Sequence, residues 1–222
     1  MVSDNLNALY GKLPSGVKLV AVSKFHPVSR LMEAYDAGQR RFGENRPQEL
    51  AQKVPQMPSD VEWHFIGHLQ TNKLKLVLPY VSMVQSVDSF HLLEAIDKWG
   101  RDNDRVVDIL LELHLGAEET KHGFSEEEIW SILQAGQIPT SAHCYRIRGL
   151  MGMATNTENE EVIEADFARI EALYKRIREE HPELAETFTE LSIGMSGDWP
   201  IAVRHGATMV RIGTDIFGAR EY

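Results

Sequence analysis

The chain has 222 residues, of which 43% are hydrophobic and 25% are charged, as in an ordinary globular protein. Its 33 acidic side chains outnumber its 23 basic ones, and the formal net charge of −10 argues against a surface for nucleic acid or anionic membrane. The single cysteine, Cys144, cannot form an internal disulfide, and the N-terminus lacks a basic start and an apolar signal core. No apolar run reaches membrane-spanning length, so we expect a cytoplasmic protein.

After a short amphipathic opening, apolar runs that predict strands alternate with stretches that predict helices. The expected strands cover residues 17–22, 40–44, 61–67, 81–87, 106–115, 145–153, 190–195 and 208–213. The expected helices cover residues 31–37, a helix from Pro47 capped by Asn45, residues 68–78, a helix capped by Asp88 or Ser89 and stopped by Gly100, residues 125–136 with a capping box of Ser125 and Glu128, residues 158–180 and 197–204, and a turn at 215–217. This alternation favours a single (β/α)8 TIM-type barrel over residues 1–222, a fold that typically needs about 250 residues. A doubly wound open sheet is the alternative, but its glycine fingerprint is missing after the first strand.

Lys24 ends the first expected strand, in which Val20, Val22 and Lys24 share one face. If that face points into a closed barrel, the amine lies at the mouth of an apolar interior, where desolvation favours its neutral, nucleophilic form. Such a lysine can form an imine with an aldehyde or a ketone. A solvated lysine that ends a strand is the alternative reading of this stretch.

The loops at the ends of the last two expected strands carry residues suited to a phosphate group. In barrels of this type the active site lies at the carboxyl ends of the strands, and the loops after strands seven and eight often bind phosphate at the start of a short extra helix. Ser196 and Gly197 follow the seventh strand, and Gly213 and Thr214 stand at the end of the eighth. Two hydroxyls and free backbone N–H groups are therefore expected to converge on one anion. Ordinary helix capping by Ser196 is the alternative.

Arg211 lies within the apolar eighth strand, on the face opposite Val210 and Ile212. A guanidinium inside a barrel needs a partner, because an unpaired buried charge is too costly. Glu44 or Glu112 would be a structural partner, and an acceptor atom of a ligand would be a functional one.

Metal chemistry finds little support in the sequence. His64 and His68 are four residues apart, but they span a strand and a turn rather than one helical face, which argues against a zinc pair. The pair His143-Cys144 has no second cysteine nearby. We therefore predict no metal site.

Several segments together resemble the pyridoxal phosphate homeostasis protein family (the YggS-like type), which is similar in fold to the barrel domain of alanine racemase. The segments are 20–24 (VAVSK), 42–45 (FGEN), 64–73 (HFIGHLQTNK), 148–151 (RGLM), 191–196 (LSIGMS) with Asp198, 210–214 (VRIGT) and 216–220 (IFGAR). The resemblance implies that Lys24 carries pyridoxal 5′-phosphate (PLP) as a Schiff base. It also implies roles for four other residues, with the phosphate held by Ser196, Gly213 and Thr214 and the pyridine nitrogen faced by Arg211.

The resemblance also places Asn45 near the cofactor. The sequence departs from the family pattern at two other places. The segment before the first strand is shorter than usual, which puts the usual N-terminal helix in question. Met153 stands where the family more often has an aliphatic residue, and it is expected to alter packing beside the cofactor.

The resemblance implies a PLP-binding protein of intracellular PLP homeostasis, a carrier or buffer without efficient turnover. Its partners would be PLP and PLP-dependent apo-enzymes, and the lack of a spare apolar stretch favours a monomer. A small PLP-dependent amino-acid racemase or decarboxylase is the alternative, and a cofactor-free Schiff-base aldolase is a third possibility.

Overall fold

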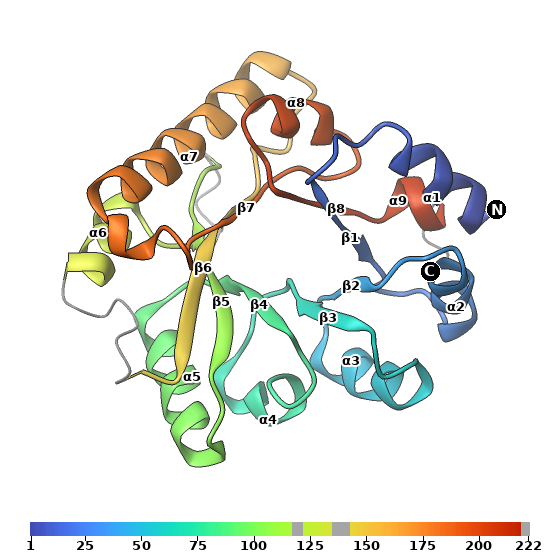
Figure 1. Cartoon of the computed structure of the whole chain (residues 1–222), viewed down its shortest axis with the longest axis horizontal. Helices are drawn as coiled ribbons and strands as arrows, with labels where there is room; N and C mark the ends of the chain where they lie inside the picture. The colour runs from blue at the N-terminus through green and yellow to red at the C-terminus, as the bar shows by residue number, and fades with distance from the viewer. Residues whose placement is uncertain (117–121, 135–142, 219–222) are drawn as a thin grey trace.

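The computed structural model of this protein describes residues 1–116, 122–134 and 143–218 (Figure 1). Eight parallel strands pair in chain order and the first also pairs with the last, so that the sheet closes into a barrel. The strands are β1 (Lys18–Val22), β2 (Arg41–Glu44), β3 (Glu62–Phe65), β4 (Met83–Val87), β5 (Val107–Leu113), β6 (Tyr145–Gly152), β7 (Glu190–Ser192) and β8 (Met209–Ile212). The predicted (β/α)8 barrel is confirmed, and the open sheet is wrong.

Helices surround the barrel on its outside, as Figure 1 shows. In the described part of the chain they are α1 (Val2–Tyr10), α2 (Val28–Asp36), α3 (Pro47–Lys53), α4 (Leu74–Val77), α5 (Phe90–Asn103), α6 (Glu126–Gln134), α7 (Glu160–Glu180), α8 (Trp199–Arg204) and α9 (Thr214–Phe217), with 3₁₀ turns at Val54–Gln56, Thr71–Lys73 and Pro182–Leu184. No helix among these residues combines the length and the apolar character that crossing a bilayer requires.

The apolar core forms two layers because strand side chains alternate between the two faces of the sheet. Outward-facing residues such as Phe42 and Val210 are fully buried between the strands and the helices. A smaller cluster fills the barrel interior, and its members are Val20, Met83, Leu110, Met151 and Met209. Val20 therefore points inward, as expected for the strand face that Lys24 continues.

The N-terminal helix that the short segment before β1 put in question is present. α1 buries Val2, Leu6 and Leu9. The side-chain amide of Asn5 donates to the carbonyl of Ile216 at 3.0 Å, which ties α1 to α9 next to it (Figure 1). The two ends of the described chain are thus packed together.

Two of the predicted helix caps have different outcomes. The cap assigned to Asn45 is wrong: α3 starts after Arg46, with Pro47 in its first turn and no side-chain cap. The capping box of Ser125 and Glu128 at the start of α6 is confirmed. There the Glu128 carboxylate accepts from the Ser125 N–H at 2.8 Å, and the Ser125 hydroxyl accepts from the Glu128 N–H at 3.2 Å. The expected end of this helix at Gly136 lies outside the described residues.

The predicted stop of α5 at Gly100 is wrong, because the helix continues to Asn103 and ends at Asp104, in the left-handed region with φ of 50°. Gly100 serves close packing instead, since a Cβ there would lie 2.4 Å from the Cβ of Cys144. At the start of the same helix Ser89 is the N-cap, and its hydroxyl accepts from the N–H of Leu92 at 3.3 Å.

The expected helix over residues 68–78 is also wrong at its start. The chain stays extended after Gly67, forms a 3₁₀ turn at Thr71–Lys73, and becomes α-helical only at Leu74. Gly67 lies against the neighbouring loop, where a Cβ would approach the carbonyl oxygen of Asn45 to 2.5 Å. The hydroxyl of Ser86 also donates to the carbonyl of Gly67 at 2.5 Å. These contacts hold the segment along the barrel rim, which leaves His68 on a loop.

Candidate functional site

A cavity of about 230 Å³ lies at the carboxyl end of the barrel. All of the predicted site residues line it, namely Lys24, Asn45, Ser196, Gly197, Arg211, Gly213 and Thr214. They come from the strands β1, β2, β7 and β8 or the loops that follow them. The barrel topology thus brings together residues that are far apart in the sequence.

The cavity wall also contains residues that the sequence did not assign to a site. These are Val22, His26, Ile66, Met195 and Gly218. Met153 also lines the cavity, as the sequence led us to expect. The signal for Val22 was its shared strand face with Lys24. The histidine could be found only from the fold, since the ring of His26 stacks on Phe217 of α9 with centroids 4.8 Å apart.

A sharp turn follows Lys24 and fixes its direction. Phe25 has φ of 68°, a left-handed conformation that is uncommon for a residue with a bulky side chain. Its backbone N–H donates to the Glu49 carboxylate at 3.0 Å, and the guanidinium of Arg46 lies 4.5 Å above its ring. Both of these partners lie at or next to the start of α3. The helix therefore holds the turn that directs Lys24 to the cavity wall.

A buried ion pair lies below this turn. Lys53 Nζ donates to Glu44 Oε1 at 2.7 Å and to the backbone carbonyl of Ser23 at 2.8 Å, and the Ser23 hydroxyl donates to Glu44 Oε1 at 2.6 Å. Burial raises the pKa of Glu44, while the charge and hydrogen bond of Lys53 oppose that rise. The network connects Ser23, which directly follows β1, and Glu44 at the end of β2 to α3.

The prediction that Glu44 is a partner of Arg211 is therefore wrong. Gly43, and not Glu44, faces the barrel interior, because a Cβ on Gly43 would lie 3.0 Å from the side chain of Val20. Glu44 points the other way, toward the helices, where Lys53 meets it.

Arg211 is buried in the barrel and held by oxygen atoms of two neighbouring strands. Its Nη1 donates to the carbonyl of Ser192 at 2.6 Å and to the Ser192 hydroxyl at 2.7 Å, and its Nη2 donates to the carbonyl of Gly152 at 2.9 Å. Burial lowers the pKa of Arg211 to about 10, although the carboxylates of Glu112 and Asp198 act to raise it. The guanidinium thus stays charged at neutral pH, and Glu112 acts on it through its charge.

A chain of hydrogen bonds continues from Arg211 across the barrel. The Ser192 hydroxyl donates to Gln85 Oε1 at 2.7 Å, and Gln85 Nε2 lies 2.7 Å from His64 Nδ1. Burial lowers the pKa of His64 to about 3, helped by the charges of Arg41 and Lys18. A neutral imidazole can accept at Nδ1, so every link of the chain has a donor and an acceptor.

Two further observations bear on whether a ligand fits the cavity. The Oδ1 atom of Asn45 is buried and has no hydrogen-bond partner among the described residues. An unsatisfied buried acceptor costs about 1–3 kcal/mol, so a donor on a ligand would relieve it. A second cavity of about 320 Å³ adjoins the first and shares Met153, Met195 and Gly197 with it. The residues present thus offer an amine, a cation, two hydroxyls and a spare acceptor to one small ligand.

A closed parallel barrel with a lysine after its first strand and hydroxyl groups after its last two strands defines a protein of the alanine racemase N-terminal type. The sequence profile of that family, described as alanine racemase, N-terminal domain, matches residues 1–221. Among curated relatives, the pyridoxal phosphate homeostasis protein of Haemophilus influenzae is 35% identical over 100% of this chain and 97% of its own. That of Escherichia coli is 35% identical over 96% of this chain and 89% of its own. The chain belongs to the pyridoxal phosphate homeostasis protein family.

Solved structures agree with this assignment. PipY of Synechococcus elongatus without PLP superposes with a TM-score of 0.89 at 36% identity, covering 98% of this chain and 100% of PipY. The structure of PipY with PLP bound gives a TM-score of 0.86 at 35% identity over the same shares of the two chains. The resemblance stated from the sequence motifs is confirmed.

Proposed function

We propose that this protein binds PLP in the cavity at the barrel mouth and acts in intracellular PLP homeostasis, as a carrier or buffer of the cofactor. The observation that carries the proposal is the convergence of Lys24, Arg211 and the hydroxyl-bearing loops on one cavity of about 230 Å³. The relatives named for PLP homeostasis and the PLP-bound structure of PipY support it. The unit proposed to bind the cofactor is the barrel of residues 1–222.

Each group on the cavity wall has a counterpart on PLP. Lys24 would hold PLP through its amine, for which the PLP aldehyde would supply an electrophile, with loss of water on Schiff-base formation. Ser196, Gly197, Gly213 and Thr214 would hold the phosphate, since hydroxyl and backbone N–H groups are suited to charged oxygens.

The other two polar groups suit the PLP ring. Arg211 would donate to the pyridine nitrogen, and the unpaired Oδ1 of Asn45 would accept from the phenolic hydroxyl. The role of Arg211 is the one that the resemblance implies, whereas the resemblance placed Asn45 only near the cofactor.

We further propose that the protein turns over amino acids poorly. A guanidinium donates hydrogen bonds and keeps its charge, so a pyridine nitrogen that faces Arg211 must remain an unprotonated acceptor. An unprotonated ring is a weaker electron sink, which handicaps decarboxylation and transamination. A small PLP-dependent racemase or decarboxylase is the second candidate, because the adjoining cavity of about 320 Å³ leaves room for a substrate.

The proposed partners are apo-enzymes that receive PLP, and the proposed assembly is a monomer. The large exposed hydrophobic side chains are scattered over separate elements: Tyr10 belongs to α1, Phe90 to α5 and Val162 to α7. Sedimentation of the PLP-loaded protein at micromolar concentration would give the mass of one chain, 25.2 kDa, and a stable dimer would contradict the proposal.

The binding proposal is tested by adding PLP to the cofactor-free protein and reducing it with borohydride. Peptide mapping should place the pyridoxyl group on Lys24. Lys24→Ala should abolish the imine absorption but keep some binding through the phosphate, whereas the control Lys73→Ala should behave like the unchanged protein. A pyridoxyl group mainly on Lys73, Lys75 or Lys121 would overturn the assignment.

The carrier role needs a separate experiment. The PLP-loaded protein is mixed with a PLP-dependent apo-enzyme, and activation is timed against an equal concentration of free PLP. With a carrier, the rate of apo-enzyme activation should increase with the concentration of the PLP-loaded protein. This increase should exceed what the PLP released into solution accounts for. Activation that only follows the slow release of free PLP would leave a buffer role and exclude direct transfer.

A further inference from the structure

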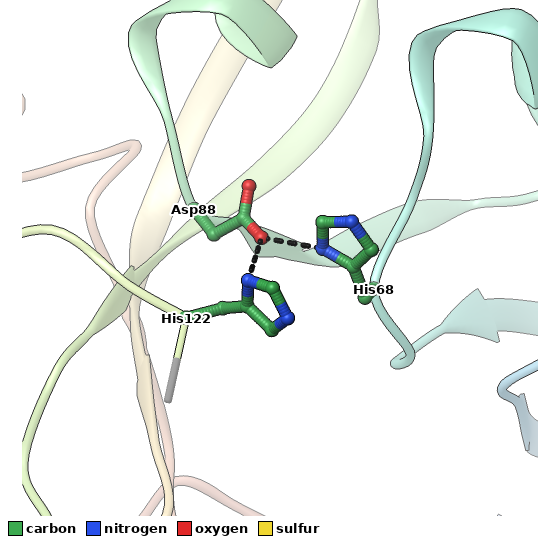
Figure 2. A group of neighbouring side chains, drawn as sticks. All are labelled: His68, Asp88 and His122. Atoms are coloured by element: carbon green, nitrogen blue, oxygen red, sulfur yellow. Dashed lines mark hydrogen bonds and ion pairs between the residues drawn. The ribbon is translucent and has the colours of Figure 1, made fainter. Parts of the chain in front are cut away.

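Three side chains that the cofactor site does not use meet on the same end of the barrel. His68 follows β3, Asp88 directly follows β4, and His122 lies in the loop after β5. Figure 2 shows both imidazoles directed at one oxygen of the carboxylate. His68 Nδ1 lies 2.8 Å from Asp88 Oδ2, and His122 Nδ1 lies 3.6 Å from the same atom.

The spacing of these atoms suits one metal ion. One ligand atom from each of the three residues can be chosen so that all lie within 4.8 Å of one another. Zinc bonds to nitrogen and oxygen are about 2.0–2.2 Å long, so the ligand atoms of a tetrahedral site are roughly 3.3 Å apart. The two distances to Asp88 Oδ2 lie on either side of that value. Because the side chains of His68 and His122 are 46% and 57% exposed, small rotations would complete the geometry.

The charges at the site favour a cation. The side chain of Asp88 is only 5% exposed, and a nearly buried carboxylate needs a positive partner. The two imidazole rings stack with their centroids 4.1 Å apart, so both histidines lie beside the one carboxylate. A second carboxylate, that of Glu112, is also nearby: burial raises its pKa, and the negative charge of Asp88 adds to that rise. A divalent cation would satisfy the carboxylate and could take one nitrogen from each imidazole as a ligand.

We propose that His68, Asp88 and His122 form a binding site for a divalent transition metal, with zinc as the ion that best fits two imidazole nitrogens and one carboxylate oxygen. Magnesium and calcium prefer oxygen ligands only, so the donor set selects against them. The exposure of both histidines leaves the fourth position open to water or to a ligand group. In the sequence, His68 was considered as a metal ligand only together with His64. In the structure, His64 points into the barrel and contacts Gln85, so it is not the partner of His68.

The experiment titrates chelator-treated protein with zinc chloride in an isothermal calorimeter, in a buffer free of phosphate. We expect one zinc ion per chain, and cobalt chloride should produce visible absorption bands of four-coordinate Co²⁺. His68→Ala, Asp88→Asn and His122→Ala should each weaken zinc binding at least tenfold. The matched control is His181→Ala, because His181 also lies 2.8 Å from a carboxylate, that of Glu183.

Circular dichroism and a cooperative urea transition of each variant establish that it is folded, and the exposed His122 is the substitution least able to disturb the barrel. No saturable zinc uptake by the folded protein would overturn the proposal. So would zinc binding that all three variants retain, or binding that only the control removes. Equal affinity for magnesium would contradict the assignment by donor type. The readout is metal binding itself, so failure here leaves the proposed PLP function untouched.

Discussion

Ser192 and Arg211 are joined by two hydrogen bonds, because Nη1 of the guanidinium donates to both the carbonyl oxygen and the hydroxyl of the serine, at 2.6 and 2.7 Å. The same hydroxyl donates its proton to Gln85 Oε1, so it can act toward Arg211 only as an acceptor. A guanidinium cannot act as an acceptor, which fixes the direction of the whole chain as far as His64. The cation at the cavity wall is thereby held in one orientation.

Ser192→Ala should destabilise the protein, because Gln85 Oε1 and one N–H group of Arg211 would lose a buried partner. Each unsatisfied buried group costs about 1–3 kcal/mol. The free energy of unfolding, measured with urea, should fall by at least about 1 kcal/mol. Ser131→Ala removes an exposed hydroxyl that donates to the backbone carbonyl of Glu128 at 2.8 Å, and it should leave stability almost unchanged. Equal effects of the two substitutions would show that the buried chain is not held as described.

Arg211 leads to a prediction about catalysis. Because its guanidinium would keep the pyridine nitrogen unprotonated, a panel of L- and D-amino acids should exchange with the Lys24 imine and react little further. Racemisation, decarboxylation and α-proton exchange are measured for each amino acid. Turnover of any of them at roughly 1 s⁻¹ or faster lies within the ordinary enzyme range and would contradict the carrier reading.

The phosphate assignment predicts a difference between two aldehydes. Ser196→Ala and Thr214→Val should each weaken binding of PLP by about 1.5–3 kcal/mol, the usual worth of a hydrogen bond to a charged oxygen. Binding of pyridoxal, which lacks the phosphate, should change little in the same variants. Absorbance titrations with both aldehydes measure this. If the variants weaken both equally, the hydroxyls do not contact phosphate.

The buried pair of Glu44 and Lys53 predicts an asymmetric response to substitution. Lys53→Met leaves an uncompensated buried carboxylate and should reduce the free energy of unfolding by about 3–5 kcal/mol. The double substitution Glu44→Gln with Lys53→Met should recover much of that loss, because it removes the orphaned charge. Lys98→Met breaks an exposed pair with Asp102 and should cost less than about 1 kcal/mol. A double variant no more stable than Lys53→Met alone would count against the role of the charge.

His205 predicts a dependence of stability on pH. Its Nδ1 lies 2.7 Å from Glu171 and its Nε2 lies 2.5 Å from Glu164, which connects the end of α8 to α7. Burial alone would lower the pKa of His205, but hydrogen bonds and charges from the two glutamates raise it above 6.5. A raised pKa means that the folded state binds the proton more tightly. The contribution is therefore complete below pH 6.5 and is lost as the pH rises through the folded-state value.

Urea unfolding at pH 6 and pH 9 measures this contribution. The unchanged protein should exceed His205→Gln in stability at pH 6 by up to about 1 kcal/mol, and the difference should shrink at pH 9. His91→Gln, at an exposed position on α5, is the control. A difference that is the same at both pH values would exclude titration of His205 as its cause.

The strands were predictable because each is a short apolar run, and their alternation with helices determined the barrel. Convergence of the cavity residues was predictable for the same reason, since the carboxyl ends of parallel strands meet at one end of a barrel. Side-chain direction at the strand ends was harder to predict. Glu44 follows the glycine that faces inward, so its side chain faces the helices, and its partner Lys53 lies on an element whose position only the fold defines.

Predictions at one glycine and at the histidines failed for a related reason, since the roles of these residues depend on contacts between distant segments. Gly100 looks like a helix stop in the sequence, but its lack of a side chain makes room for Cys144. His68, Asp88 and His122 have no recognisable spacing, because they follow three successive strands and only the pairing of β3, β4 and β5 places them side by side. Local patterns report local structure, and these contacts are not local.

The pairing of β1 with β8, with Val20 opposite Arg211, joins the first strand of the barrel to the last. A ribosome delivers the chain from its N-terminus, so Lys24 emerges long before the loops that would hold the phosphate. The proposed PLP site would therefore be complete only once β8 has closed the ring. A ligand that binds only this closed form stabilises it, by about 2.7 kcal/mol at a concentration one hundred times its dissociation constant. With PLP bound as proposed, the survival of the folded protein against proteolysis would therefore increase with the concentration of PLP.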